Sequence, residues 1–306
     1  MIVRQRARLR THLLYIGRPL LALLALDVAV AAGYVFGGWT WLAVPDVPLS
    51  IFGAVIGVIA GFRNSSAYSR WWEARTIWGA VVNHSRSLAR QVLTMITTPR
   101  PDLSLHRDLE ESKRRLVLLQ IAYVHALRNH LRRTPILPEL TGLIPEQDID
   151  CLKNQDNIPL AIQHMQAELI SECKQLGWID EIRWATLDQT LSSLMDCQGA
   201  SERIKNTPMP RIYDYFIRLF ISIYCVLLPV GMVASLGLWT PVGSALVGFM
   251  FLSLDRIGRD LETPFENLPQ DVPLTAISRT IEINLKQMMG ENSIPEPSVP
   301  VDGVLS

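Results

Sequence analysis

The sequence has few cysteines, and none of them forms the close pair that marks a disulfide framework or a zinc site. The four cysteines, separated by 22, 24 and 28 residues, are Cys151, Cys173, Cys197 and Cys225. Such spacings favour free thiols. His125 and His130 do not share a helix face, and they predict no metal site. The chain also lacks GxSxG, HExxH, P-loop and GxGxxG motifs in a suitable context, so we expect neither an enzyme nor a bound cofactor.

The chain also lacks an excess of charge of either sign. Lys and Arg number 29, and so do Asp and Glu, which gives no argument for nucleic acid or an acidic partner. Hydrophobic residues make up 49% of the chain, which is high for a soluble protein and low for one that lies wholly within lipid. We therefore predict a few membrane spans, a sizeable aqueous part and membrane lipid as a partner.

Long apolar stretches are present, and four of them predict membrane helices. Residues 19–42 carry Asp27 as their only charge and exceed the roughly 20 residues that a hydrocarbon core needs. Residues 49–62 are fewer and continue without a proline into a polar helix. Residues 216–239 and 242–254 predict a hairpin of two spans. A soluble protein with buried helices is the alternative, which two apolar stretches of 24 residues disfavour.

The N-terminal end allows two interpretations. Arg4, Arg6, Arg8 and Arg10 precede the first apolar stretch, as in a signal peptide. The apolar stretch is much longer than a signal sequence requires, so we expect a retained span. Within it, Asp27 predicts either a functional group or a buried hydrogen bond to a neighbouring helix.

Basic residues indicate the orientation of these spans. Arginines precede the first span and follow the second and the fourth, whereas the two connecting loops have no Lys or Arg. Because Lys and Arg favour the cytosolic side, we expect both termini inside.

The polar middle of the chain predicts a helical cytosolic domain, so the fold class is all-α. Apolar residues at helical spacing predict helices over 158–176, ending at Gly177, and over 180–204. Pro135, Pro138 and Pro145 predict a loop between helices. The predicted organisation is a basic cytosolic segment 1–18, membrane helices in 19–62, a cytosolic domain 63–215, membrane helices in 216–257, a cytosolic segment 258–290 and a disordered tail 291–306.

Two stripes of residues run along the second predicted span. One consists of small residues that let a neighbouring helix approach closely: Gly53, Gly57 and Gly61. The other lies about 100° round the helix and is apolar: Ala54, Val58 and Phe62. Periodicity leaves two alternatives open, ordinary helix packing or an apolar pore constriction with subunits packed through the glycines.

The residues that follow carry a specific motif. Residues 61–79 read GFRNSSAYSRWWEARTIWG, and this resembles the pattern G-F-R-N-x-x-x-Y-x-R-x-x-E-A-R-x-x-W-G of the bacterial branch of the bestrophin family. The matching polar residues are Arg63, Asn64, Tyr68, Arg70, Glu73 and Arg75. Further similarity in 201–210, 253–265 and 276–283 extends the resemblance over nearly the whole chain.

The resemblance implies a homopentameric ion channel of a bacterial inner membrane, with four membrane helices per subunit and passive conduction of small monovalent ions. It implies a pore neck lined by Ala54, Val58 and Phe62. It also implies a cytosolic aperture at Ile182, by alignment to the Glu-Arg-Ile of 202–204. Ala54 is smaller than the bulky residue usual at the top of the neck, so the upper constriction is expected to be wider or gating to rest on the other two residues.

Two properties of the family, calcium dependence and ion selectivity, cannot be assigned to this chain from the resemblance alone. Residues 264–271 hold only two scattered carboxylates where eukaryotic members carry an acidic calcium-binding run, so we expect no calcium site. The family majority favours anions such as chloride. The alternative is a monovalent cation channel, since Asp180 and Glu181 would form acidic rings beside Ile182, offset by Arg183. A second alternative is a non-conducting scaffold or receptor.

Overall fold

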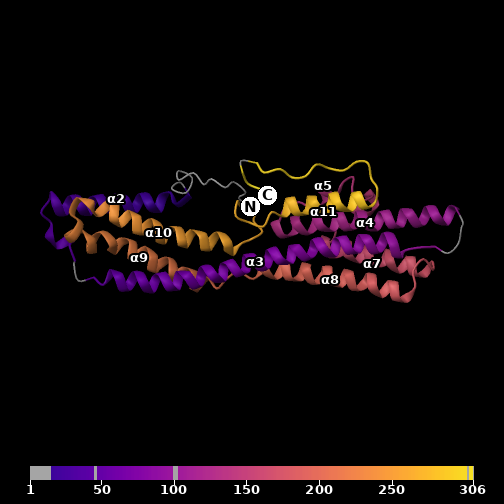
Figure 1. Cartoon of the computed structure of the whole chain (residues 1–306), viewed down its shortest axis with the longest axis horizontal. Coiled ribbons are helices and arrows are strands. Elements are labelled where there is room, and N and C mark those ends of the chain that lie inside the picture. Colours follow the sequence, from indigo (N-terminus) through magenta and orange to yellow (C-terminus); the bar gives the residue numbers. More distant parts are fainter. Residues whose placement is uncertain (1–14, 45–46, 99–102, 302, 306) are drawn as a thin grey trace. The chain divides into compact units, whose positions relative to one another are not determined.

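The computed structural model describes residues 15–44, 47–98, 103–301 and 303–305, without the side chains of 103–105, 211 and 213. All regular elements in these residues are helices, which confirms the all-α class (Figure 1). Most of the predicted basic segment 1–18 lies outside the described residues. The helices are α2 (Arg18–Val35), η1 (Thr40–Leu42), α3 (Leu49–Met95), α4 (Leu103–Arg132), α5 (Leu137–Leu140), α6 (Glu146–Leu152), α7 (Ile158–Gln175), α8 (Glu181–Asn206), α9 (Arg211–Leu236), η2 (Gly237–Trp239), α10 (Thr240–Glu262) and α11 (Leu274–Met288).

One compact unit consists of Arg4–Trp71 and Pro208–Thr263, and we call it the apolar unit. In its described part, α10 packs against α2 and α9, and α2 also contacts α9. Its core gathers Leu23 from α2, Ile56 from α3 and several residues of α9, including Ile221 and Leu228. The first part of α3 therefore joins three other helices in one bundle.

The apolar unit contains the stretches that could cross a membrane. Among the residues that the structure describes, three helical stretches are long and apolar enough, namely Arg18–Val35, part of Leu49–Met95, and Asp214–Glu262, the last of which holds both α9 and α10. Gly237 ends α9 with a φ of 51°, a left-handed conformation that glycine adopts at little cost. Pro241 then lies in the first turn of α10, where its missing N–H is tolerated, so the hairpin forms as expected.

The first predicted span is shorter than the sequence suggested. The apolar residues extend to position 42, but α2 ends at Val35. Two glycines follow, and Gly38 has a φ of 66°. A left-handed residue cannot continue an α-helix, so the chain turns there into the short helix η1.

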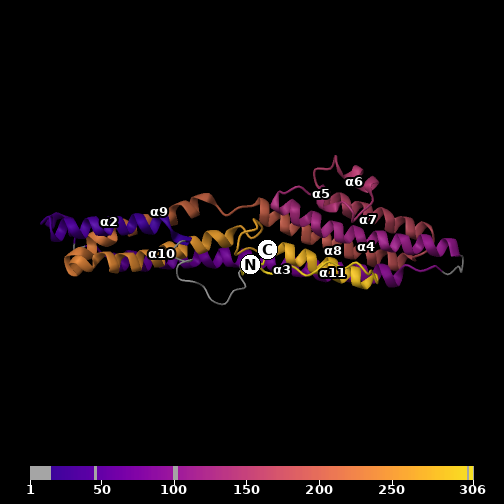
Figure 2. The same ribbon diagram turned by 90° about the horizontal axis from the view of Figure 1, so that it is seen from above.

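The second compact unit consists of Trp72–Thr207 and Pro264–Ser306, and we call it the polar unit. Here α4 is central and packs against α7, α8 and α11 (Figure 2). Its faces toward these helices bury Ile121, Tyr123 and Leu127 completely. The helices predicted over 158–176 and 180–204 are confirmed to within two residues as α7 and α8. The loop predicted around three prolines also contains the short helices α5 and α6.

Local caps explain where α7 and α8 begin and end. The side chain of Asn157 accepts a hydrogen bond from the backbone N–H of Leu160 at the start of α7. Gly177 follows α7 with a φ of 74°. The carboxylate of Asp180 accepts a hydrogen bond of 2.8 Å from the N–H of Arg183, which caps α8. Gly177 marked the end of α7 in the sequence, whereas the caps at Asn157 and Asp180 are seen in the structure.

Candidate functional site

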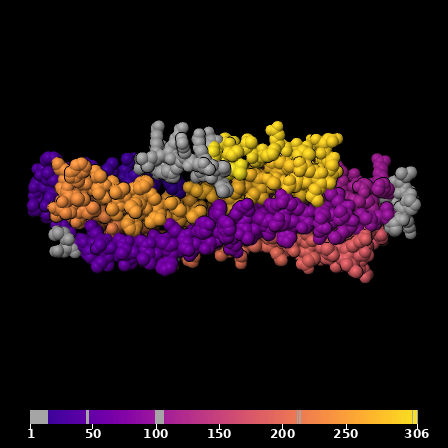
Figure 3. Space-filling view, in the orientation of Figure 1, coloured from indigo at the N-terminus to yellow at the C-terminus, as the bar shows by residue number. Residues whose placement is uncertain are grey.

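The first half of α3 has a buried face and an exposed apolar face. Ala54, Val58 and Phe62 are all exposed, with exposed fractions of 59% for Val58 and 68% for Phe62. The opposite face carries Ile56, Ala60, Arg63 and Ala67, which are all buried. The space-filling view shows α3, in purple, open at the surface (Figure 3). The apolar stripe is therefore available for contact with lipid, another subunit or a pore.

The three glycines of the neighbouring stripe have different surroundings. A Cβ atom added at Gly53 would lie 2.6 Å from the hydroxyl oxygen of Tyr224, so α9 of the same chain packs closely there. A Cβ added at Gly57 or Gly61 would meet nothing within 4 Å. Gly53 thus serves packing within the chain, and the other two glycines remain open to a further helix.

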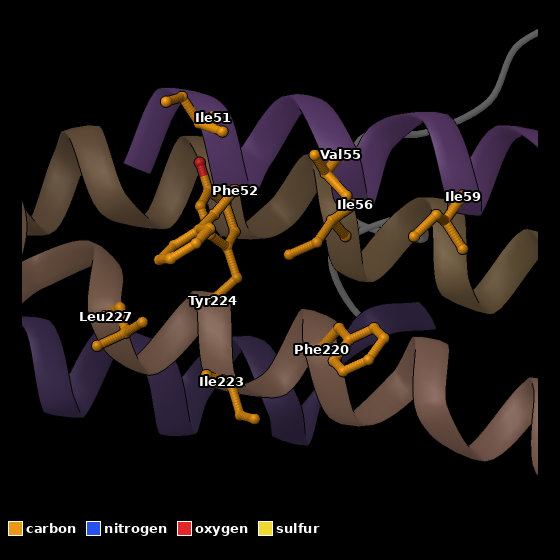
Figure 4. Close-up of a pocket in the computed structure, with 9 residues that line it drawn as sticks. All are labelled: Ile51, Phe52, Val55, Ile56, Ile59, Phe220, Ile223, Tyr224 and Leu227. Carbon is orange, nitrogen blue, oxygen red and sulfur yellow. The ribbon is translucent and has the colours of Figure 1, made fainter. Parts of the chain in front are cut away.

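An apolar groove flanks the exposed stripe of α3. It encloses about 420 Å³ between α3 and α9. Its lining is Ile51, Phe52, Val55, Ile56 and Ile59 of α3 and Phe220, Ile223, Tyr224 and Leu227 of α9 (Figure 4). Within the described residues the groove has no charged lining residue, as expected for a surface that faces lipid or an apolar helix.

Arg63, the first signature residue, is the centre of a buried ion network. Its side chain is 1% exposed. One guanidinium nitrogen forms an ion pair with Asp214 of α9 and lies 3.7 Å from a Glu262 oxygen. The other nitrogen lies 3.2 Å from a carboxylate oxygen of Asp255 and donates to its carbonyl oxygen at 3.1 Å. Arg63 thereby joins α3 to both α9 and α10.

Further groups complete this network. Arg218 pairs with Asp214, and Arg259 lies 2.8 Å from Asp255, so three carboxylates face three guanidinium groups. Asn64 donates a hydrogen bond of 3.0 Å to the carbonyl oxygen of Leu254. A Cβ added at Gly258 would lie 2.1 Å from the Asn64 side-chain oxygen. The absence of a side chain at position 258 is therefore required for this approach of α3 to α10.

The remaining signature residues lie along α3. Arg70 donates a hydrogen bond of 2.8 Å to the carbonyl oxygen of Glu262. The ring of Tyr68 stacks on Trp71 with centroids 6.2 Å apart. Glu73 forms an ion pair of 2.5 Å with Arg203 of α8. Arg75 is half-buried. Arg70 and Glu73 thus pair with neighbouring groups.

Ile182, the predicted aperture residue, lies in the first turn of α8 and is 81% exposed. The side chain of Arg183 beside it lies 3.3 Å from Asp180 and donates to the carbonyl oxygen of Met95. Glu181 is nearly fully exposed, and its only ion-pair distance among the described residues is 3.9 Å, to Lys174. The charge of Asp180 is therefore offset locally, and that of Glu181 is largely directed to solvent.

Asp27 is completely buried in the apolar unit. One oxygen of its carboxyl group accepts a hydrogen bond of 2.7 Å from the hydroxyl of Ser244 on α10. The other oxygen has no hydrogen-bond partner within the described part of the chain. The buried hydrogen bond to a neighbouring helix that the sequence allowed for Asp27 is therefore present.

A buried polar cluster in the polar unit was not predicted. A ring nitrogen of His125 on α4 lies 3.1 Å from an oxygen of Glu282 on α11. Burial opposes ionisation of Glu282, but hydrogen bonds from His125 and Lys286 and the charge of Arg279 lower its pKa to about 2. The cluster fixes α11 to α4. His125 and Glu282 are 157 residues apart in the sequence, so no local sequence pattern could have revealed this cluster.

Residues 264–271, for which the sequence predicts no calcium site, form contacts within the polar unit. Glu266 forms an ion pair of 2.6 Å with Lys205. Asp271 is 1% exposed and accepts a hydrogen bond from the N–H of Leu268. Burial raises the pKa of Asp271 to about 6. Across the residues that the structure describes, no three His, Cys, Asp or Glu side chains lie close enough to hold a metal ion.

Comparison with known proteins points to one family. The profile described as Bacterial/Fungal Bestrophin protein matches residues 10–287. The chain is 33% identical over 253 residues to the voltage-dependent anion channel-forming protein YneE of Escherichia coli K12, covering 83% of this chain and 80% of that one. It is 35% identical over 234 residues to the voltage-dependent anion channel-forming protein alr2987 of Nostoc, covering 76% and 74%.

Solved structures agree with the sequence comparison. A crystal structure of a bacterial bestrophin homologue from Klebsiella pneumoniae matches with a TM-score of 0.81 and 29% identity. The match covers 90% of this chain and 98% of the other. The similarity therefore extends over both compact units.

Proposed function

The chain belongs to the bacterial and fungal bestrophin family, and we propose that it forms an ion channel that conducts small monovalent ions passively, chloride and other anions in preference. The observation that carries the proposal is the exposed, uncharged stripe of Ala54, Val58 and Phe62, on a helix whose opposite face is buried. In a ring of identical subunits these side chains meet at the axis and form a narrow apolar neck. Such a neck gates by excluding water.

The channel is a homopentamer in the bacterial inner membrane. The beginning of α3 together with α2, α9 and α10 provides four membrane helices per subunit, and residues 63–215 and 258–290 are cytosolic. Residues 43–48 and 237–241 contain no Lys or Arg, which supports their place outside and both termini inside. The open positions Gly57 and Gly61 let neighbouring subunits approach closely around the neck.

Ile182 forms a second, cytosolic constriction. Its side chain is among the most exposed large apolar ones of the described residues, and it stands on the first turn of α8. Solvent exposure of a large aliphatic side chain has a free-energy cost that a symmetric ring of five copies reduces. The two apolar constrictions act in series on the same ion.

Three observations bear on selectivity. The relatives that match are described as anion channel-forming proteins, which supports anions. Asp180, which could form an acidic ring, is offset by Arg183. The exposed carboxylate of Glu181 favours the alternative, a sodium-type cation channel of the same family. The neck itself carries no charge and accepts either sign.

The reversal potential of the purified protein in a planar bilayer tests this proposal. Under a gradient of sodium chloride, a potential near the chloride equilibrium value supports an anion channel, and one near the sodium value supports the alternative. Val58→Ala combined with Phe62→Ala should increase the conductance, because both side chains narrow the neck. If neither protein conducts, the channel proposal fails and a scaffold is favoured. A native mass other than five subunits contradicts the pentamer.

A further inference from the structure

Phe62 and Arg63 are consecutive residues with opposite surroundings. The ring of Phe62 is 68% exposed, whereas Arg63 is 1% exposed and fixed by ion pairs to α9 and α10. Successive residues of an α-helix point about 100° apart. The direction of the Phe62 side chain is therefore determined by any contact that fixes the rotation of α3 at residue 63.

Few other fully buried side chains near residue 63 can fix this rotation. The buried residues on either side of Arg63 along the same face are Ala60 and Ala67, whose single methyl groups cannot interlock with a neighbouring helix. Gly57 and Gly61 have no side chain. Arg63 is thus the only large buried side chain of α3 between Ile56 and residue 67.

The ion network around Arg63 is well suited to hold one orientation. A guanidinium group has donors in a fixed planar fork, and those of Arg63 reach Asp214 on α9 and Asp255 on α10 from opposite nitrogens. Asn64 adds a hydrogen bond to α10, in the space left by Gly258. A rotation of α3 would break these charge-assisted contacts together.

We propose that Arg63 is the positioning residue of the neck: its ion pairs to Asp214 and Asp255 set the rotation of α3, and thereby how far Phe62 enters the pore and which ion sizes pass. This inference rests on the proposed channel function. Arg63 acts through Phe62 and does not touch the permeating ion.

The flux ratio of a large to a small ion tests the inference, because it is independent of the amount of folded channel. Chloride and gluconate are suitable for an anion channel, and sodium and N-methylglucamine for a cation channel. Arg63→Lys keeps the charge but loses the fork, and it should change the ratio by about tenfold or more, the effect of one lost charge-assisted hydrogen bond on an equilibrium. Gly258→Ala displaces Asn64 and Arg63 and should change the ratio in the same direction.

Two controls separate positioning from general damage. Arg86→Lys alters an exposed arginine that hydrogen-bonds Asn284, and it should leave the ratio unchanged. In a Phe62→Ala background, Arg63→Lys should no longer alter the ratio, because the ring through which it acts is absent.

The outcomes distinguish the two proposals. A conducting Arg63→Lys channel with the wild-type ratio overturns the positioning role and leaves the channel function intact. If Arg63→Lys does not assemble, the ratio of Gly258→Ala decides in the same way. Absence of flux from the wild-type protein contradicts the channel function instead.

Discussion

The two compact units accommodate buried polar groups in different ways. In the apolar unit, only five described polar or charged residues are buried: Asp27, Arg63, Thr240, Ser244 and Asp255. Four of them form two pairs, Asp27 with Ser244 and Arg63 with Asp255. The polar unit has many more, including the cluster around His125 and a chain of hydrogen bonds from Gln166 through Gln120 to Ser85.

The difference agrees with the proposed surroundings, in which lipid covers most of the apolar unit, Arg63 lies at its cytosolic boundary, and water surrounds the polar unit. Lipid offers no hydrogen bonds to a polar group, so the bundle tolerates few of them and must pair those it has. In a unit surrounded by water, a polar group near the surface that loses its protein partner can form a hydrogen bond with water instead. We therefore expect single polar substitutions to have larger effects in the apolar unit, and single apolar substitutions to have larger effects in the polar unit.

The largest loss of stability is expected for Arg63→Ala. The substitution leaves Asp214, Asp255 and Glu262 close together without their central cation, at a cost of about 3–5 kcal/mol. Chemical unfolding in mixed micelles measures the change. The control is Arg114→Ala, which removes an arginine that is 52% exposed and pairs with Glu291, at a cost of about 1 kcal/mol or less. Equal losses of unfolding free energy for the two variants would contradict the proposed difference between the units.

A pair of apolar truncations tests the other half of the comparison. Leu127 in the polar unit and Ile221 in the apolar unit are both almost completely buried. Leu127→Ala should cost about 2–5 kcal/mol. Ile221→Ala should cost less, because lipid is as apolar as the helix contacts that the side chain loses. Thermal unfolding in liposomes gives both values, and a greater loss for Ile221→Ala would contradict the membrane location of α9.

Asp271→Asn should remove a pH dependence from the polar unit. Burial raises the pKa of Asp271 to about 6, above the value of about 3.9 for an unfolded chain. The folded state therefore binds this proton more tightly, and its contribution to stability is present below about pH 4 and is lost as the pH rises through 6. Asparagine keeps an oxygen for the N–H of Leu268. Between pH 4 and 7, the unfolding free energy of the wild type should fall by about 2 kcal/mol or less relative to that of the variant. Parallel pH curves for the two proteins would show that Asp271 titrates normally.

The smallest effect is expected for Glu73→Gln, although Glu73 belongs to the family motif. Its ion pair with Arg203 is about half exposed on both sides, and such pairs contribute about 1 kcal/mol or less. Unfolding of the variant in parallel with wild type measures the loss. A much larger loss, or a change in ion flux at unchanged stability, would give Glu73 a role beyond this pairing.

The sequence predicted the elements whose signals are local. Apolar length revealed the first part of α3 and the hairpin of α9 and α10. Apolar residues at helical spacing, with Gly177 after α7, revealed α7 and α8. It failed at the end of α2, because apolar composition continues past the turn at Gly38. Hydropathy indicates whether a segment can lie in an apolar environment. It does not indicate where the helix ends, because backbone conformation determines that.

The candidate site was predictable only in part for the same reason. The spacing of Ala54, Val58 and Phe62 identified an apolar face that is exposed in the structure. The partners of Arg63 are 151 or more residues away along the chain, so no spacing within α3 could identify them. The glycine stripe was treated as uniform, yet Tyr224 contacts only the first of its three positions. Such differences arise from tertiary neighbours.

The cysteines provide a way to count subunits. Of the four free thiols, only Cys151 is exposed, and burial raises the pKa of Cys173 to about 11, which suppresses its reactivity further. A maleimide dye should therefore attach to one position per chain without any engineered substitution. In single-molecule fluorescence of liposomes that each hold one complex, the number of photobleaching steps then gives the stoichiometry of the wild-type assembly directly.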